Sequence, residues 1–238
     1  MEKKADTLTG AKRAAGYRAA EMVETGMVVG LGTGSTVFFT IERLSERVGD
    51  GLRIAAIPTS FQTALRAKEA HIPLTTLDDN PVIDIAIDGA DEVDPKFRLI
   101  KGRGAAHLRE KCVAAAANHF VVVVDAQKMV KKLGTAAVPV EVLPFAIKPV
   151  LGQLSALGCV PVVREAVKKD GPVITDNGNF VVDCRFREIR NPEKLEAVIA
   201  AIPGVIESGL FCGFTKKTTV IIGGLKKVKV LSSADIVA

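Results

Sequence analysis

The stretch from Ile83 to Lys111 constrains the fold more than any other part of the chain. It begins with the run Ile83–Ile87, in which Asp84 is the only charged residue. A nearly continuous apolar run of this length is typical of a central strand in a parallel sheet, because such a strand is buried on both faces. The run ends in Asp88-Gly89-Ala90-Asp91-Glu92, so the sequence predicts carboxylates where the strand ends.

A second apolar piece, Phe97–Ile100, ends in Lys101-Gly102-Arg103-Gly104, and a helical pattern over Ala105–His119 then carries Glu110. We expect two strands to deliver carboxylates and a lysine to one edge of a sheet. Open α/β sheets bind ligands outside the tips of their parallel strands. The stretch therefore predicts proton-transfer chemistry on a small anionic substrate.

Composition supports a globular protein, and alternating strand and helix signals along the chain point to an α/β fold. The chain has 238 residues, of which 48% are hydrophobic and 25% are charged, so a large core is possible and disorder is not expected. Aromatic residues make up 5% and Trp is absent, which argues against stacking platforms for single-stranded nucleic acid. The net charge of +5 is spread along the chain. It indicates either a solvated surface or a basic approach for an anionic metabolite.

The N-terminal residues and the cysteines bear on where the protein works. The N-terminal residues lack an apolar signal core, and no apolar run is long enough to span a membrane. The cysteines show no CxxC pair and no metal-ligand spacing with His. We expect a reduced, cytoplasmic protein with no membrane or nucleic-acid partner. The four cysteines are Cys112, Cys159, Cys184 and Cys212.

A glycine-rich turn follows the first expected strand, Met27–Gly30. Leu31-Gly32-Thr33-Gly34-Ser35-Thr36 leads into a helical run, Val37–Val48. Glycines let a backbone approach a ligand closely, and the amides and dipole of a helix start favour a phosphate. Lys12, in the first turn of an expected helix over Gly10–Thr25 capped by Thr9, hints at a nearby anion, because a cation there opposes the helix dipole.

This turn does not match the common nucleotide-binding motifs. The third glycine of the dinucleotide fingerprint is replaced by Ser35, and the strand Arg53–Ile57 ends in Pro58-Thr59-Ser60 without an acidic residue for a ribose. No Gly-Lys-Ser/Thr follows, so the turn is not a P-loop. A tight structural turn without a ligand stays open as the alternative.

The second half of the chain indicates an inserted domain. A β-α-β-β-α-β order, with a hairpin signal at Asn177-Gly178, predicts a ferredoxin-like unit near 135–203. Residues 1–134 and 204–238 would then form the catalytic domain, to which Thr218–Leu231 returns as one or two strands. Further expected elements are helices over Phe61–Ala70, Ile147–Leu157 and Glu193–Ile202, and strands over Pro73–Leu77, Phe120–Val124, Val138–Phe145, Val160–Ala166, Val173–Asp176, Phe180–Phe186 and Val205–Phe211.

The candidate chemical groups each have an ordinary alternative. Asp88 and Asp91 could serve acid–base work on adjacent hydroxyls, or could belong to a simple Asp–Gly turn. Lys101 could stabilise a developing oxyanion, or could lie on the surface. Glu110 could be functional, or could pair with Arg109 and Lys111 on an exposed helix face. The three histidines are expected to be structural or on the surface: His71, His107 and His119.

Taken together, these motifs resemble the type A ribose-5-phosphate isomerase family. The matching stretches occur in the family's order and cover most of the chain: GLGTGST, DGADEVD, KGRGAAHLREK, VVDAQK, VPVEVLP and TDNGN. The resemblance implies a Rossmann-like open, mostly parallel sheet with helices on both faces, plus the inserted ferredoxin-like α+β domain. Two residues depart from the family's pattern. Arg103 occupies a position that is often glycine, and His107 one that is usually small or apolar.

The resemblance also implies an activity. The family interconverts ribose 5-phosphate and ribulose 5-phosphate in the pentose phosphate pathway, through an enediolate and without a metal or organic cofactor. It implies that Glu110 moves the proton between C2 and C1, that Asp88 assists ring opening, and that Asp91 and Lys101 hold the sugar hydroxyls and the enediolate. A homodimer or homotetramer is expected. The implied substrate-binding residues are Lys12, Thr33, Gly34, Ser35, Thr36, Asp88, Gly89, Ala90, Asp91, Lys101, Gly102, Arg103, Gly104 and Lys128.

Three rival functions can be compared with this one. A sugar-phosphate sensor usually carries a DNA-binding segment, and no helix-turn-helix pattern precedes Met27. A nucleotide-dependent oxidoreductase is disfavoured by Ser35 and by the missing acidic residue. A sugar-phosphate deaminase of similar architecture would release ammonia from an amino sugar phosphate.

Overall fold

The computed structural model describes residues 2–224 and 227–235, which form two compact units. The first unit comprises the described residues up to Ala90, Arg109–Met129 and those from Phe214 onward. The second comprises Asp91–Leu108 and Val130–Gly213, so it contains the expected 135–203 and adds sequence on both sides. Among the described residues, no helix is both long and apolar enough to cross a membrane.

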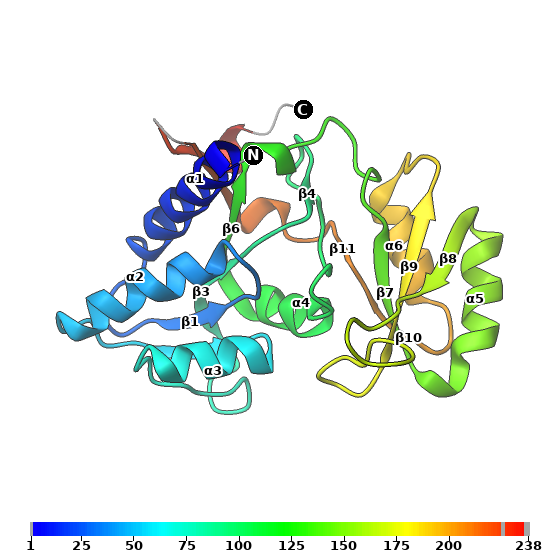
Figure 1. Ribbon diagram of the computed structural model, residues 1–238, viewed down its shortest axis with the longest axis horizontal. Coiled ribbons are helices and arrows are strands. Elements are labelled where there is room, and N and C mark those ends of the chain that lie inside the picture. The colour runs from blue at the N-terminus through cyan, green and yellow to red at the C-terminus, as the bar shows by residue number, and fades with distance from the viewer. Residues whose placement is uncertain (1, 225–226, 236–238) are drawn as a thin grey trace. The chain divides into compact units, whose positions relative to one another are not determined.

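The first unit is built on a six-stranded sheet in the order β13-β12-β6-β3-β1-β2. Every neighbouring pair is parallel except β12 with β13. Helices cover both faces of this sheet (Figure 1), as expected for a Rossmann-like fold. The strands are β1 (Val28–Leu31), β2 (Ala55–Pro58), β3 (Ile83–Asp88), β6 (Ala117–Asp125), β12 (Thr218–Gly223) and β13 (Lys229–Leu231). The helices are α1 (Glu2–Ala20), α2 (Val37–Gly49), α3 (Phe61–Glu69) and α4 (His107–Ala116), with 3-10 turns at Ala126–Lys128, Thr215–Lys217 and Ser233–Asp235.

Strand β3 is the buried central strand that its sequence predicts. Only Asp84 of its six residues is exposed, and its Oδ2 accepts a hydrogen bond from the Val28 amide at 2.7 Å. Complete burial of an aliphatic side chain such as Ile83 or Ile87 contributes about 1.5–3 kcal/mol. The apolar residues of this run therefore stabilise the centre of the sheet. The carboxylate of Asp84, the one charged group among Ile83–Ile87, is exposed and paired with a backbone amide.

The strand order places a topological switch at β1. The chain adds β2 on one side of β1 and then returns to add β3 on the other side. In open α/β sheets, ligands bind in the crevice outside the carboxyl ends of the strands at such a switch. Gly32 follows β1 and Asp88 ends β3, so two predicted site segments lie at this point.

Close packing accounts for a glycine within β1. A Cβ atom added at Gly30 would lie 2.4 Å from Cγ1 of Val113 in α4. Any larger residue at position 30 would push α4 away from the sheet. The same helix carries Glu110 three residues before Val113, on the same helical face. The glycine thus sets how close the Glu110 face comes to the sheet.

The second unit contains the ferredoxin-like arrangement that the sequence predicts. Its four-stranded antiparallel sheet has the order β10-β7-β9-β8, and α5 and α6 connect its strands in a β-α-β-β-α-β sequence. A separate three-stranded sheet has the order β11-β5-β4. The strands are β4 (Glu92–Val93), β5 (Leu99–Ile100), β7 (Val138–Val142), β8 (Cys159–Val163), β9 (Phe180–Phe186), β10 (Val205–Ser208) and β11 (Leu210–Phe211). The helices are α5 (Ile147–Ala156) and α6 (Pro192–Ala200), and a 3-10 turn at Pro144–Ala146 precedes α5.

The three-stranded sheet corrects two predictions. Phe97–Ile100 does not share a sheet edge with β3, because only Leu99–Ile100 forms a strand and it pairs with β4 and β11. The expected strand Val205–Phe211 is divided at Gly209. A Cβ atom at Gly209 would lie 2.2 Å from the Lys101 carbonyl oxygen, so only glycine lets the chain pass from one sheet to the other.

Four local predictions were also wrong. Thr9 is not a cap but lies inside α1, whose lysines and alanines favour helix further toward the N-terminus. Pro73–Leu77 forms only a single bridge, Ala56 to Leu74, because proline cannot donate to a ladder. Val173–Asp176 likewise forms only one isolated bridge, Ile174 to Phe180, rather than a strand. Helix α4 starts at His107 rather than Ala105, whose positive φ of 58° is incompatible with an α-helix.

Candidate active site

The turn after β1 is built around the carboxylate of Asp88. A Cβ atom at Gly32 would lie 2.1 Å from the Asp88 carboxyl group, so only glycine allows this approach. Asp88 Oδ1 accepts hydrogen bonds from the amides of Thr33 at 3.2 Å and Gly89 at 2.7 Å. The side chain is 3% exposed. Asp88 is therefore an oriented, buried carboxylate at the switch point, which is more than a simple turn requires.

A network of hydroxyl groups supports the same turn, and no sequence motif points to it. Thr33 Oγ1 lies 2.9 Å from Thr59 Oγ1, 2.8 Å from Ser60 Oγ and 3.2 Å from Thr63 Oγ1. Thr63 Oγ1 also donates to the Gly32 carbonyl at 2.8 Å. The hydroxyl of Thr33 is thus engaged inside the protein. The available signal was the pair of hydroxyl residues directly after β2.

The start of α2 carries the groups suited to an anion. Lys12 lies in the interior of α1 and not in a first turn as predicted, but its Nζ still donates to Ser35 Oγ at 3.0 Å. Gly34 has a φ of 133°, which side-chain-bearing residues rarely adopt, and it is exposed together with Ser35. Thr36 is the N-cap residue of α2 and makes no side-chain cap bond. A helix start with a lysine and hydroxyls beside it is a favourable place for a phosphate.

Glu110 lies in the first turn of α4 and is 5% exposed. This burial excludes the alternative of an exposed salt-bridged helix face. Its neighbour Arg109 instead places its guanidinium over the Phe61 ring, 4.8 Å from the centroid. Burial of a carboxylate is costly, so a fold that keeps one near the tip of a sheet is a candidate for function.

Lys128 lies just beyond the carboxyl end of β6, as Gly32 does for β1 and Gly89 for β3. Strand β6 is the neighbour of β3, and Lys128 ends the 3-10 turn directly after it. The turn is fixed by Asp125, whose Oδ1 accepts the Gln127 amide at 2.9 Å. Lys12, Asp88, Glu110 and Lys128 therefore all belong to the first unit.

Asp91 and Lys101 belong to the second unit, where the turn Lys101–Gly104 organises them. Asp91 Oδ2 accepts the Arg103 amide at 3.0 Å, and the Asp91 amide donates to Ile100 at 2.8 Å. Lys101 is 3% exposed, and its Nζ lies 5.5 Å from the centroid of the Phe211 ring. Lys101 is therefore a buried lysine rather than a surface one. The Arg103 side chain is exposed and reaches only 3.8 Å from Asp91.

Gly102 and His107 are matched in shape. Gly102 has a φ of 104°, and a Cβ atom there would lie 2.7 Å from Nδ1 of the fully buried His107. The histidine thus packs directly beneath the turn. Gly104, on the outer side of the turn, is exposed.

Glu92, the remaining acid of the Asp-rich segment, has a structural role. Its two carboxylate oxygens accept the amides of Ala136 at 2.5 Å and Gly134 at 2.7 Å. Glu92 thereby ties β4 to the segment before β7. Within the described residues, no three His, Cys, Asp or Glu side chains are grouped so that they could hold a metal ion.

Comparison with known proteins gives a consistent result. A family model described as ribose 5-phosphate isomerase A (phosphoriboisomerase A) matches residues 55–227. The ribose-5-phosphate isomerase A of Methanoregula boonei is 69% identical over 233 residues, which cover 98% of each chain.

Solved structures agree with the sequence comparison. Ribose 5-phosphate isomerase A from Methanocaldococcus jannaschii superposes with a TM-score of 0.89 at 46% identity, covering 93% of this chain and 98% of that one. A D-ribose-5-phosphate isomerase in complex with phospho-erythronic acid gives a TM-score of 0.90 at 44% identity, covering 93% and 97%. This chain, in which Glu110 and Asp88 are buried, therefore belongs to the ribose 5-phosphate isomerase A family.

Proposed function

We propose that this protein interconverts D-ribose 5-phosphate and D-ribulose 5-phosphate, with Glu110 as the base. The observation that carries the proposal is the burial of Glu110 on the α4 face that packs against Gly30 of β1, in a chain of this family. An aldose becomes a ketose when the proton on C2 moves to C1. That transfer needs one positioned base and a group that stabilises the negative charge on oxygen.

The phosphate is assigned to the turn after β1. Ser35, Thr36 and the start of α2 would accept it, with Lys12 and Lys128 supplying positive charge. The structural relative in complex with phospho-erythronic acid supports a sugar phosphate as the substrate, because that acid combines a phosphate with a sugar-like chain. Binding at the remote phosphate would position the reacting carbons, which lowers the entropic part of the barrier.

Asp88 is assigned to ring opening. Its Oδ1 is held by two backbone amides, so the carboxyl group has a fixed direction. A carboxyl group fixed in this way can exchange a proton with the ring oxygen and the C1 hydroxyl as the furanose opens. Opening exposes the carbonyl at C1, which makes the C2 proton acidic.

The isomerisation then proceeds in two proton transfers at carbon and one between the two oxygens. Glu110 removes the proton from C2, and the electron pair moves toward O1 to give an enediolate. Lys101 and Asp91 are assigned to the two oxygens, where the lysine stabilises the negative charge and the carboxylate holds a hydroxyl proton. The hydroxyl proton on O2 then passes to O1 through Asp91, Glu110 returns its proton to C1, and O2 becomes the carbonyl oxygen of ribulose 5-phosphate. The same groups run the reaction in reverse.

The test is a ketose-formation assay with ribose 5-phosphate in the presence of a chelator. We expect turnover that the chelator does not reduce, and much weaker turnover of unphosphorylated ribose. Equal use of ribose and its phosphate would contradict the phosphate assignment, and loss of activity with the chelator would contradict a metal-free mechanism. Ammonia release from an amino sugar phosphate would favour the deaminase alternative. The expected homodimer or homotetramer is a separate prediction, which sedimentation would test.

A further inference from the structure

The turn Lys101–Gly104 is tied to the rest of the second unit by an arginine far along the chain. Arg164 Nη1 donates to the carbonyl oxygens of Gly102 and Arg103, each at 3.0 Å. On another side of the turn, the Lys101 amide donates to Gly209 at 2.9 Å. No motif in the sequence pointed to Arg164.

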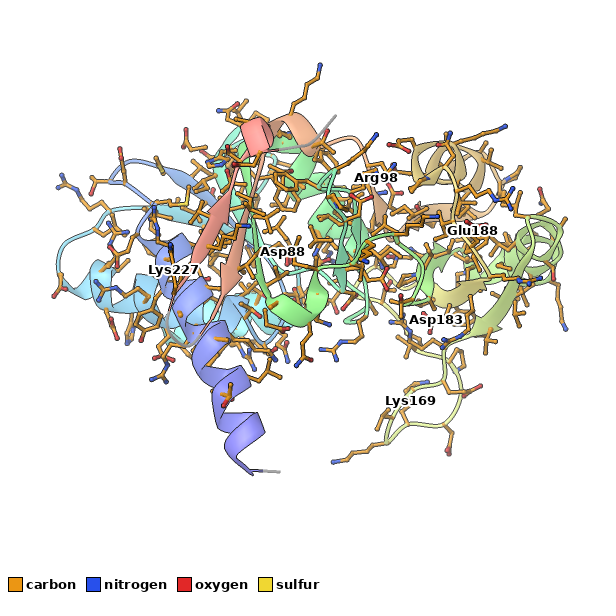
Figure 2. The ribbon with its side chains drawn as sticks, turned by 90° about the horizontal axis from the view of Figure 1, so that it is seen from above. Asp88, Arg98, Lys169, Asp183, Glu188 and Lys227 are labelled. Carbon is orange, nitrogen blue, oxygen red and sulfur yellow. The ribbon has the colours of Figure 1, made fainter. Side chains whose placement is uncertain are left out.

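Arg164 is itself held in one orientation. Its Nε donates to Asp183 Oδ2 at 2.8 Å and its Nη2 to Asp183 Oδ1 at 2.5 Å. This two-pronged pairing of guanidinium and carboxylate fixes direction as well as distance. Asp183 projects from β9, where Figure 2 labels it, and Arg164 directly follows β8, bonded through its amide to Val181. The donor Nη1 is therefore aimed at the turn by a rigid part of the sheet.

One peptide group connects Arg164 with Asp91. The carbonyl of Gly102 accepts from Arg164, and the amide of the same peptide unit, on Arg103, donates to Asp91 Oδ2 at 3.0 Å. A trans peptide points its carbonyl and its amide in opposite directions. Fixing the carbonyl toward Arg164 therefore fixes the amide toward Asp91. Hydrogen bonds joined in this way also polarise each other, so the guanidinium strengthens the amide as a donor.

We propose that Arg164 is a positioning residue for the reaction, acting through the Gly102–Arg103 peptide on Asp91. This inference rests on the proposed function, because it assigns the purpose of the turn. The ordinary alternative is an ion pair that merely stabilises β8 against β9. The two roles predict different results when the guanidinium is removed. A positioning residue lowers kcat even in protein that is fully folded, whereas a purely structural ion pair changes only the stability.

The second unit offers a matched control. Arg98 also binds carboxylates, with Nε 2.7 Å and Nη2 2.5 Å from Asp94 Oδ2 and Nη1 3.0 Å from Glu193 Oε1. Its side chain is 18% exposed, against 17% for Arg164. Arg98 lies well apart from Asp183, the partner of Arg164 (Figure 2). Arg98→Met thus removes a comparable ion pair without removing the bonds to the two turn carbonyls.

The experiment compares Arg164→Met, Asp183→Asn and Arg98→Met in ribose 5-phosphate kinetics and urea unfolding. We expect Arg164→Met to lower kcat by about 10- to 100-fold, as for a small misplacement of reacting groups, with little change in KM. Asp183→Asn keeps the side-chain volume and should lower kcat less. The Arg164 guanidinium remains in this variant but is no longer held in one orientation by a carboxylate. This variant also tests the inference if Arg164→Met does not fold. Arg98→Met should change stability but not kcat.

A double variant tests the route of action. If Arg164 acts through Asp91, then Asp91→Asn and Arg164→Met together should lower kcat scarcely more than Asp91→Asn alone. Multiplied losses in the double variant, or a kcat for Arg164→Met equal to that of Arg98→Met, would overturn the inference. If the wild-type protein forms no ketose at all, the proposed function fails and the inference falls with it. If the wild-type protein is active and the kcat of Arg164→Met equals that of the wild type, the inference about Arg164 fails while the proposed function stands.

Discussion

Two glycine-rich turns carry most of the assigned chemistry, and they are supported in different ways. The turn at Gly32–Thr36 is held by neutral hydroxyls from the next strand and helix and by Asp88 from the neighbouring strand. The turn at Lys101–Gly104 is held by the guanidinium of Arg164, which lies 62 positions beyond Gly102 and is fixed by Asp183.

This difference has a physical origin. The first turn joins a parallel strand to a helix, so its neighbours are adjacent strand tips and its amides suit an anion. The second turn follows a two-residue strand, β5, in a small three-stranded sheet. Such a short strand makes few backbone hydrogen bonds that could hold the turn. The side chain of Arg164, which follows β8 of the four-stranded sheet, provides the additional hydrogen bonds. The two turns should therefore respond differently to substitution.

Of the two turns, the second should show the larger effect. Lys101→Met should lower kcat by about 10²–10³-fold, the usual result of removing one donor to a developing oxyanion. The substitution keeps a buried, unbranched side chain, so stability should change little. Steady-state kinetics and urea unfolding check this together. A wild-type kcat would remove Lys101 from its assigned role.

The first turn should break at Gly32. An added Cβ in Gly32→Ala would meet the Asp88 carboxyl group, so either the turn or the carboxylate must move. We expect kcat to fall by roughly 10²-fold from misplacement, and the free energy of unfolding to fall by about 1–3 kcal/mol from overpacking. Gly49→Ala, where nothing lies within 4 Å of the added atom, is the control. Equal behaviour of the two variants in kinetics and urea unfolding would argue against the close approach.

A smaller effect is expected where the first turn meets the phosphate. Ser35→Ala removes one hydroxyl donor, and a hydrogen bond to a charged group contributes about 1.5–3 kcal/mol, so KM for ribose 5-phosphate should rise roughly tenfold or more. The value of kcat should change much less. A fall in kcat at constant KM would place Ser35 in the chemistry instead of the phosphate site.

The smallest effect concerns stability and lies outside both turns. Burial lowers the pKa of His119, whose Nε2 lies 2.9 Å from Thr219 Oγ1. The unfolded chain then binds a proton at the ordinary His pKa of about 6.5 while the folded chain does not. The free energy of unfolding should therefore fall as pH drops below about 6.5, and His119 contributes no such dependence above it. Urea unfolding at acidic and neutral pH should show a shallower loss for His119→Gln, and an unchanged pH dependence would contradict this assignment.

The sequence predicted what depends on local pattern. The apolar run of β3, the turn before α2 and the acidic end at Asp88 follow from neighbouring residues, and the structure places them at one switch point. For Glu110 the residues alone left two roles open, since flanking charges fit a surface helix equally well. Only the packing of Val113 against Gly30 shows that this helical face is buried.

The sequence could not predict what depends on distant pairing. Arg164 and Asp183 come from different parts of the antiparallel sheet, and neither has a motif that links it to the turn at Gly102. The separate sheet of β11, β5 and β4 was missed because two-residue strands carry no periodic pattern. The hydroxyl group of Thr63 was missed because a threonine in a helix usually has no site role.

The central claim is that the carboxylate of Glu110 carries the proton between C2 and C1, and one variant tests it directly. Glu110→Gln preserves the shape of the buried side chain but cannot accept the proton. We predict that kcat for ribose 5-phosphate falls by about 10²–10⁴-fold, the usual contribution of a general base, while KM and the unfolding curve stay close to those of the wild type. A folded Glu110→Gln protein that turns over ribose 5-phosphate at the wild-type rate would contradict the account.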